Sequence, residues 1–188
     1  GRRRGLRDEM VKGLLSRVKG LAPWKVVEGG SERQYSIRNG LAVVSEEADI
    51  VLVHDAARPL VSLAAIEAVI SAAHEKGAAI AAVRAKNTIK VVGENGRGEA
   101  TPSRASLWEV QTPQGFRREI LQRAYEKAAQ DGFLGTDDAS LVERIGEAVF
   151  VVESDYGNLK ITTPEDLWMA EALLAHSAEI VDEMKVTI

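Results

Sequence analysis

Two short and continuous apolar runs constrain the fold of this chain more than any other feature. They occupy residues 49–54 (DIVLVH) and 78–83 (AAIAAV), and such runs are typical of strands buried on both faces of a parallel sheet. Between them, apolar residues recur at helical spacing from Leu63 to Ile70, and Gly77 follows as a helix stop signal. Repeated strand–helix units predict an α/β fold with a mostly parallel sheet and helices on both faces.

The remaining segments largely continue this alternation. Helical patterns are predicted at residues 6–18, 31–45, 117–130 and 137–145, and further strands at 25–28, 148–153 and 159–162. A last helix is predicted to begin at Pro164, with Thr163 as its N-cap and Asp166 three residues further on.

Residues 88–111 break the alternation. The segment TIKVVGENGRGEATPSRASLWEVQ contains two short strand patterns around Asn95-Gly96. This dipeptide is typical of type I′ hairpin turns, because both central positions of the turn need positive φ. A hairpin inside an α/β chain usually projects from its body, so we predict a β-arm at residues 88–111 within a single domain covering residues 1–188.

Charge and composition narrow the range of functions. The 188 residues include 24 Lys and Arg and 28 Asp and Glu, a net charge of −4, which argues against a nucleic-acid-binding protein. The absence of cysteine excludes disulfides, thiolate metal ligands and cysteine nucleophiles. The apolar runs are far shorter than the ~20 residues of a membrane span, and no apolar stretch follows the basic residues 1–5. We expect a cytoplasmic protein that does not bind membranes.

The strongest candidate for chemistry directly follows the first apolar run. In α/β sheets, ligands bind at the carboxyl ends of the strands, and HDAARP places Asp55 and Arg58 at such an end. This acid and this cation could hold a divalent metal and face an anion. Alternatively, Asp55 stabilises a turn and Arg58 is solvated. His54 is interpreted as packed or hydrogen-bonded, and the other two histidines, His74 and His176, as structural.

Further candidates are scattered hydroxyl and cationic side chains. They lie on the arm (Thr88, Lys90 and Arg104) and in the second half of the chain (Thr112, Thr136 and Lys160). Each has a simpler explanation: a solvated hairpin for the arm, an N-cap for Thr136 and a solvent-facing strand residue for Lys160. Gly29-Gly30 before a helical pattern is either a ligand-binding helix start or a tight turn. Taken together, several cations and one acid suit phosphoryl or nucleotidyl transfer.

Four ordered motifs give the sequence a specific resemblance. VLVHDAARPLVS, LWEVQTPQGF, TDDASLVE and GNLKITTPEDL closely resemble the 2-C-methyl-D-erythritol 4-phosphate cytidylyltransferase family, from Leu6 to about His176. The resemblance implies a glycosyltransferase-A-like nucleotidyltransferase fold, which is Rossmann-like. It also implies attack by a phosphate oxygen of the methylerythritol phosphate on the α-phosphorus of CTP, with Mg²⁺ assisting. A ribitol 5-phosphate cytidylyltransferase and an inactive nucleotide-binding or dimerisation module are the alternatives.

The resemblance also implies residue roles. It makes Asp55 the acid that binds the metal and contacts both substrates, and it makes Asp55, Arg58, Lys160 and Arg3 the catalytic set. The expected CTP-binding residues are Gly30, Ser31, Ser36, Asp55 and Lys160, although the family often has Asp at the position of Ser31. The expected residues for the sugar-alcohol phosphate are Thr88, Arg104, Thr112, Thr136 and Asp55. Because the family's arm residues reach the neighbouring subunit, a homodimer with shared active sites is expected.

The front of the sequence departs from the family pattern. Family members begin with a strand, a glycine-rich loop and a catalytic Lys, whereas this chain has only GRRRG before its first helical pattern. Gly1 to Arg3 resemble the tail of that loop, with Arg3 at its phosphate-contacting position. A segment is therefore expected to be missing between about Gly5 and Leu6. Asn87 also stands where the family usually has Asp, a change we expect to be tolerated.

Overall fold

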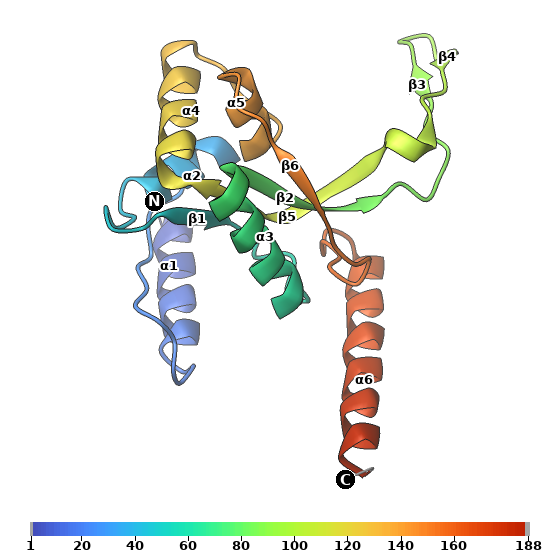
Figure 1. Ribbon diagram of the computed structural model, residues 1–188. Coiled ribbons are helices and arrows are strands. Elements are labelled where there is room, and N and C mark those ends of the chain that lie inside the picture. Colours follow the sequence, from blue (N-terminus) through green and yellow to red (C-terminus); the bar gives the residue numbers. More distant parts are fainter. Residues whose placement is uncertain (1, 187–188) are drawn as a thin grey trace. The chain divides into compact units, whose positions relative to one another are not determined.

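A four-stranded sheet lies at the centre of residues 48–188 (Figure 1). Its strand order is β1 (Ile50–Val53), β5 (Trp108–Arg117), β2 (Ala78–Arg84) and β6 (Phe150–Glu153). β2 and β6 pair in parallel, and β5 runs antiparallel to both β1 and β2. The predicted α/β class is confirmed. The sheet is mixed, because β5 opposes the direction that the other three strands share.

The computed structural model describes residues 2–186, with side chains described for residues 9–176. The chain divides into two compact units, Gly1–Glu47 and Ala48–Ile188, each of which is described by itself. The single domain expected from the sequence stays a prediction. No helix among the described residues is both long and apolar enough to cross a membrane.

Three helices pack on the sheet. They are α3 (Leu63–Lys76), α4 (Arg118–Gln130) and α5 (Asp138–Arg144). α3 contacts all four strands, and α4 and α5 pack against each other as well as against the sheet. Gly77 ends α3 with a φ of 94°, as the sequence predicts, because a left-handed helix stop favours glycine.

Adjacent residues of β5 show that the helices cover both faces of the sheet. A Cβ atom on Gly115 would lie 2.8 Å from Cγ1 of Val69 in α3, so this position faces α3 and needs a glycine. The neighbouring Gln114 side chain instead donates to Asp137 Oδ2 (2.8 Å) and accepts from the main-chain nitrogen of Ala139 (3.1 Å), at the start of α5. Successive strand residues point to opposite faces, so the prediction of helices on both faces is confirmed.

The arm contains a second, two-stranded sheet of β3 (Val91–Val92) and β4 (Gly98–Ala100), which extends beyond the ends of β2 and β5 (Figure 1). A short 3₁₀ turn, η1 (Arg104–Ser106), leads back to β5. The predicted hairpin is present, but the predicted type I′ turn is wrong. Gly96 has a φ of 77°, whereas no non-glycine residue in the described part of the chain has positive φ. The main-chain nitrogen of Gly96 donates to Gly93 O instead, which places the turn one residue earlier.

The unit of residues 1–47 contains α1 (Arg2–Leu15) and α2 (Arg33–Leu41). Both helices were predicted, although α2 is shorter than the predicted segment 31–45. α1 continues through Gly5 and Leu6 without a break. The predicted strand at residues 25–28 is wrong, since these residues form neither a helix nor a strand. The strand predicted at residues 159–162 is also wrong, because these residues form neither a helix nor a strand. Within this segment, the main-chain nitrogen of Ile161 donates a hydrogen bond to Ala57 O (2.8 Å).

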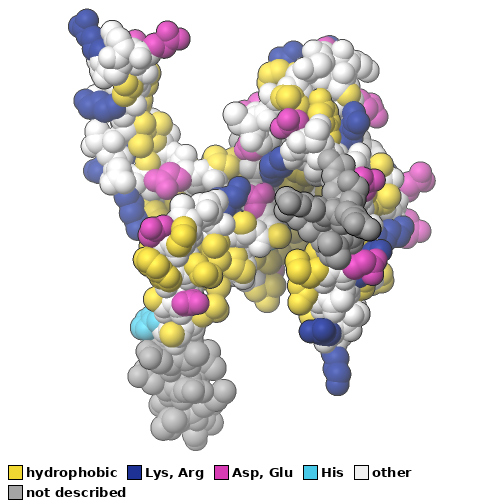
Figure 2. All heavy atoms as spheres, turned by 180° about the vertical axis from the view of Figure 1, so that it is seen from behind, with side chains coloured by type: hydrophobic (Ala, Val, Ile, Leu, Met, Phe, Trp, Pro, Cys, Tyr) yellow, Lys and Arg dark blue, Asp and Glu magenta, His cyan; other side chains and the backbone are white. Residues whose placement is uncertain are grey.

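The last helix, α6 (Pro164–Val186), begins as the sequence predicts. The carboxylate of Asp166 accepts hydrogen bonds from the main-chain nitrogens of Thr162 and Thr163, each at 2.8 Å, and from the Thr162 hydroxyl. The Thr163 hydroxyl in turn accepts from the nitrogen of Asp166 (3.4 Å). Apolar side chains gather over the first turns of α6 (Figure 2), where Trp168 is 64% exposed.

We predict a pH-dependent loosening of the start of α6. Its hydrogen bonds from Thr162 and Thr163 lower the pKa of Asp166 from 3.8 to about 2. A depressed folded pKa stabilises the structure above the unfolded value, so this stabilisation is present above about pH 3.8 and disappears as the pH falls towards 2. An NMR titration should show the Thr162 and Thr163 amides following the Asp166 carboxyl. In Asp166→Asn this common transition should be absent, and its persistence would contradict the assignment.

Candidate functional site

An ion pair between Asp55 and Lys160 lies at the centre of the candidate site. Asp55 follows β1 and Lys160 follows β6, the two edge strands of the sheet, and Lys160 Nζ lies 2.9 Å from Asp55 Oδ2. The segment after β6 therefore crosses the carboxyl ends of the strands to reach the loop after β1. The main-chain hydrogen bond from Ile161 to Ala57 holds the two loops together. The predicted convergence of these two residues is observed.

Thr112 connects this pair to the central strand β5. Its Oγ1 accepts a hydrogen bond from the main-chain nitrogen of Asp55 (3.0 Å) and lies 3.0 Å from His54 Nδ1. His54 Nε2 lies 3.1 Å from the carbonyl oxygen of Arg58, which can only accept, so Nε2 donates. In the neutral imidazole Nδ1 is then the acceptor of the Thr112 hydroxyl proton. His54 is hydrogen-bonded, as the sequence predicts.

Arg58 is turned partly into the protein. Its Nη1 donates to the carbonyl oxygen of Asn158 (2.7 Å), and its main-chain nitrogen donates to Asp55 O (2.9 Å). Burial lowers the pKa of Arg58 from its usual value, and the negative charge of Asp55 offsets part of this effect. The guanidinium thus connects the loop after β1 to the loop that carries Lys160.

Two buried amides near the site were not predicted. Gln111 and Asn158 are 6% and 0% exposed, and Asn158 Nδ2 donates to Gln111 Oε1 (2.9 Å) and to the carbonyl oxygen of Thr112 (2.9 Å). Gln111 Nε2 donates to Asp155 O (3.1 Å). The sequence shows only that both are polar residues close to candidate site residues. It does not indicate that their side chains are buried.

The structure places Thr136 on an exposed loop and excludes the simpler explanation that it is an N-cap. The N-cap of α5 is Asp137, whose Oδ1 accepts from the main-chain nitrogen of Ser140 (2.9 Å). Asp137 has the required extended backbone and a carboxylate that can accept two bonds, so the predicted Thr136 N-cap is wrong. The side chain of Gln114 on β5 donates a hydrogen bond to the other carboxylate oxygen of Asp137. The loop that carries Thr136 therefore lies beside β5, near a residue that follows Thr112 by two positions.

The predicted arm residues lie apart from this cluster. Thr88 and Arg104 are both exposed, and Arg104 Nη1 donates to the carbonyl oxygen of Lys86 (2.9 Å) at the base of the arm. The Lys86 ammonium lies 3.4 Å from the centre of the Tyr156 ring. The hydrogen bond to Lys86 keeps Arg104 at the base of the arm, on the segment that extends beyond the ends of β2 and β5 (Figure 1).

The predicted CTP-binding residues Gly30, Ser31 and Ser36 belong to the unit of residues 1–47. Ser36 Oγ accepts from the nitrogen of Gly30 (3.0 Å), and a Cβ atom on Gly30 would overlap that of Tyr35. Gly30 is therefore needed for a close approach to α2. The contacts of these residues with CTP stay predictions, and the side chain of Arg3 lies outside the described residues.

The donor set around Asp55 fits a substrate-bound metal better than a permanent one. Among the side chains of residues 9–176, no group of three or more Asp, Glu, His or Cys could hold a metal ion. Mg²⁺, however, often binds through one or two carboxylates together with substrate phosphates and water. Asp55, which is 18% exposed and already faces a cation, suits that arrangement.

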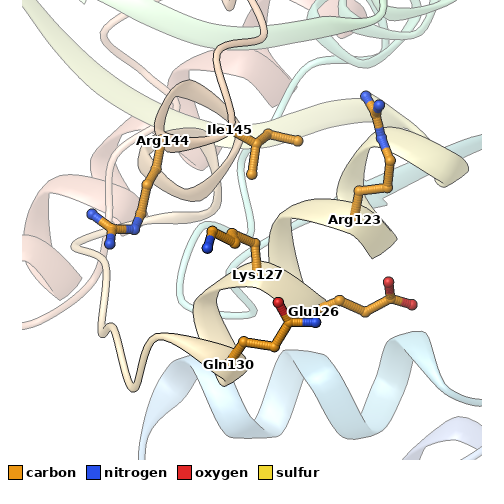
Figure 3. A pocket seen from close by; sticks show the side chains of 6 residues that line it. All are labelled: Arg123, Glu126, Lys127, Gln130, Arg144 and Ile145. Atoms are coloured by element: carbon orange, nitrogen blue, oxygen red, sulfur yellow. The ribbon is translucent and has the colours of Figure 1, made fainter.

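A pocket on α4 and α5 shares no residue with the Asp55 cluster (Figure 3). It has a volume of about 480 Å³ and is lined by three cationic side chains, Arg123, Lys127 and Arg144. Arg123 pairs with Glu147, while Lys127 and Arg144 both pair with Asp131 at 2.9 and 3.0 Å. Both cations lower the pKa of Asp131. The ion pair between Arg144 and Asp131 connects α5 to the end of α4.

An α/β sheet that gathers an acid, cations and a threonine at its strand ends is typical of an enzyme acting on phosphates. Comparison with known proteins places the chain among the nucleotidyltransferases. The sequence profile of the 2-C-methyl-D-erythritol 4-phosphate cytidylyltransferases matches residues 7–176, and the chain belongs to this family.

Individual relatives agree with this assignment. Enzymes of this name from Caldanaerobacter subterraneus subsp. tengcongensis and Bacillus pumilus are 52% and 54% identical to the chain, each over 81% of its length. The alignments cover 67% and 66% of those proteins, so the chain spans about two thirds of the length of these curated relatives. A 4-diphosphocytidyl-2C-methyl-D-erythritol synthase from Anaerococcus prevotii superposes with a TM-score of 0.81 at 33% identity, covering 89% of this chain and 76% of the other.

Proposed function

We propose that the protein transfers the cytidylyl group of CTP to 2-C-methyl-D-erythritol 4-phosphate. The products are 4-diphosphocytidyl-2-C-methyl-D-erythritol and pyrophosphate, within isoprenoid biosynthesis. Family membership supports the reaction. The observation that carries it is the Asp55–Lys160 pair, which Thr112 holds at the carboxyl ends of the strands.

The reaction is an in-line displacement at phosphorus. A phosphate oxygen of the sugar alcohol forms a bond to the α-phosphorus, the bond from that phosphorus to the bridging oxygen breaks, and pyrophosphate leaves with the electron pair. No covalent enzyme intermediate is needed, so the protein contributes orientation and charge stabilisation. Lys160 neutralises developing negative charge on phosphate oxygens, and Thr112 keeps Asp55 in place through its main-chain nitrogen.

Asp55 is the residue that would hold Mg²⁺ together with the phosphates of CTP. When bound, the metal would supply positive charge at the phosphate oxygens. Lys160 is the second positive group within reach of the same carboxylate. This role of Asp55 explains why an acid belongs in a site whose substrates are both anions.

The homodimer is part of the same proposal. Thr88 and Arg104 lie on an arm apart from their own Asp55, and Val91 and Val92 on β3 are exposed apolar residues. An arm with these properties suits a two-fold assembly in which each arm reaches the partner's site. Thr88 and Arg104 would then contact the phosphate of the sugar alcohol, and Thr136 would approach the same substrate.

We further propose that the enzyme acts in the cytoplasm.

The direct test measures pyrophosphate release by the purified protein, whose intact mass is determined first. With CTP and Mg²⁺, 2-C-methyl-D-erythritol 4-phosphate should be turned over much faster than ribitol 5-phosphate. A preference for ribitol 5-phosphate would overturn the assigned substrate. No release with either compound from a protein of the expected mass would indicate a nucleotide-binding or dimerisation module instead.

A further inference from the structure

Asn158 joins three segments of the site from a fully buried position. Its side-chain Nδ2 donates to Gln111 Oε1 and to the Thr112 carbonyl on β5, each at 2.9 Å. Its own carbonyl accepts from Arg58 Nη1 (2.7 Å) in the loop after β1, and its main-chain nitrogen donates to Asp155 Oδ1 (3.1 Å). Asn158 precedes Lys160 by two residues, so these bonds fix the backbone from which the lysine projects.

The chemistry at this position requires an amide. Gln111 Nε2 donates to the Asp155 carbonyl, so Gln111 presents its oxygen to Asn158. The Thr112 carbonyl is also an acceptor, which means that Asn158 must supply two N–H groups. An aspartate would place carboxylate oxygens against both acceptors, and leucine would leave both unpaired in a buried environment.

We propose that Asn158 is a positioning residue that holds Lys160 against Asp55 and in register with Thr112. This inference rests on the proposed function, in which Lys160 neutralises phosphate charge. Asn158 is 0% exposed, so it touches neither substrate and acts through the lysine. Small displacements of a charged group from its working geometry are costly in rate, because orientation supplies much of the catalytic effect.

The first test measures the kinetics of Asn158→Leu and of the smaller Asn158→Ser, which retains one donor. The value of kcat should fall roughly ten- to a hundredfold in Asn158→Leu and less in Asn158→Ser, while each KM changes by less than about threefold. Tyr125→Phe is the matched control, because it removes a buried hydrogen bond to Asp138 on the α4–α5 side. It should lower thermal stability and leave kcat near the wild-type value.

A double-mutant cycle separates positioning from a general loss of structure. If Asn158 acts through Lys160, adding Asn158→Leu to Lys160→Met should change kcat by less than about twofold. Multiplicative losses in the double variant, or an unchanged kcat in Asn158→Leu, would overturn the proposal. So would a rise in KM with unchanged kcat, because that pattern indicates direct substrate contact.

A second measurement is independent of turnover. Reductive ¹³C-methylation keeps the charge of lysines, and the Lys160 NMR signal can be assigned by its loss in Lys160→Arg. In Asn158→Leu and Asn158→Ser this signal should move towards those of solvent-exposed lysines, and in Tyr125→Phe it should stay in place. A wild-type protein that releases no pyrophosphate would contradict the proposed function. The NMR signal would still test the position of Lys160, because it does not depend on turnover. An unmoved signal in both Asn158 variants would refute the positioning role.

Discussion

Asp55→Asn should reduce pyrophosphate release by a factor of roughly 10²–10³ while leaving the protein folded. Asparagine preserves the shape of the side chain and leaves the main-chain bond from residue 55 to Thr112 intact. It removes the negative charge that faces Lys160 at 2.9 Å and that would hold the metal. The expected loss is therefore in kcat, measured at saturating CTP and sugar-alcohol phosphate, with an unchanged circular dichroism spectrum.

Asp131→Asn provides the matched control for this substitution. Asp131 also forms ion pairs, with Lys127 and Arg144, but these lie on α4 and α5 and outside the proposed site. Losing its charge should leave kcat within about twofold of wild type, since partly exposed ion pairs contribute little. If Asp55→Asn were equally harmless, Asp55 would be confined to stabilising the turn in which its carbonyl accepts from Arg58.

An uninterrupted apolar run predicted burial correctly for only one of the two strands that consist of such a run. β2 is buried from Ala78 to Val83 inside the sheet. β1 has the same kind of sequence, yet it is an edge strand beside the antiparallel β5, and of its residues only Val53 is buried. β5 was not predicted as one long strand, because QTPQGF contains a proline and a glycine, which are depleted in strands, and two polar glutamines. Its glutamines become compatible with burial only through tertiary partners: Asp137 and Ala139 for Gln114, and Asn158 for Gln111.

The site could be predicted to the extent that it depends on strand ends. Asp55 follows an unmistakable strand, so its place at the carboxyl edge follows from the α/β pattern. Lys160 was expected on a strand, yet it lies on an irregular segment that reaches Asp55. Local signals were less reliable: Asp137 replaces Thr136 as the N-cap because its backbone is extended and its carboxylate is in reach of Ser140. Such choices depend on backbone geometry, which the residue types alone do not determine.

Arg104→Ala should raise the KM for 2-C-methyl-D-erythritol 4-phosphate far more than the KM for CTP. A hydrogen bond from a charged donor to a phosphate contributes about 1.5–3 kcal/mol, which corresponds to a roughly 10- to 150-fold change. Within its own chain, Arg104 donates to the Lys86 carbonyl at the base of the arm, and the proposed dimer would place its phosphate contact in the partner's site. Equal increases of both KM values would contradict a role specific to the sugar alcohol.

Mixed dimers decide whether Arg104 acts in its own subunit or in the partner. In a two-fold dimer with shared sites, pairing an Asp55→Asn chain with an Arg104→Ala chain creates one site with both defects and one with neither. Co-expression of the two variants at equal levels makes half of the dimers mixed, so the rate at low sugar-alcohol phosphate should recover to about a quarter of the wild-type value. If Arg104 serves the site of its own chain, every site in the mixed dimer keeps one defect and no recovery occurs. Neither variant assayed alone should show this activity. If the rate recovers when the two variants are combined, the arm of one chain must complete the active site of the other.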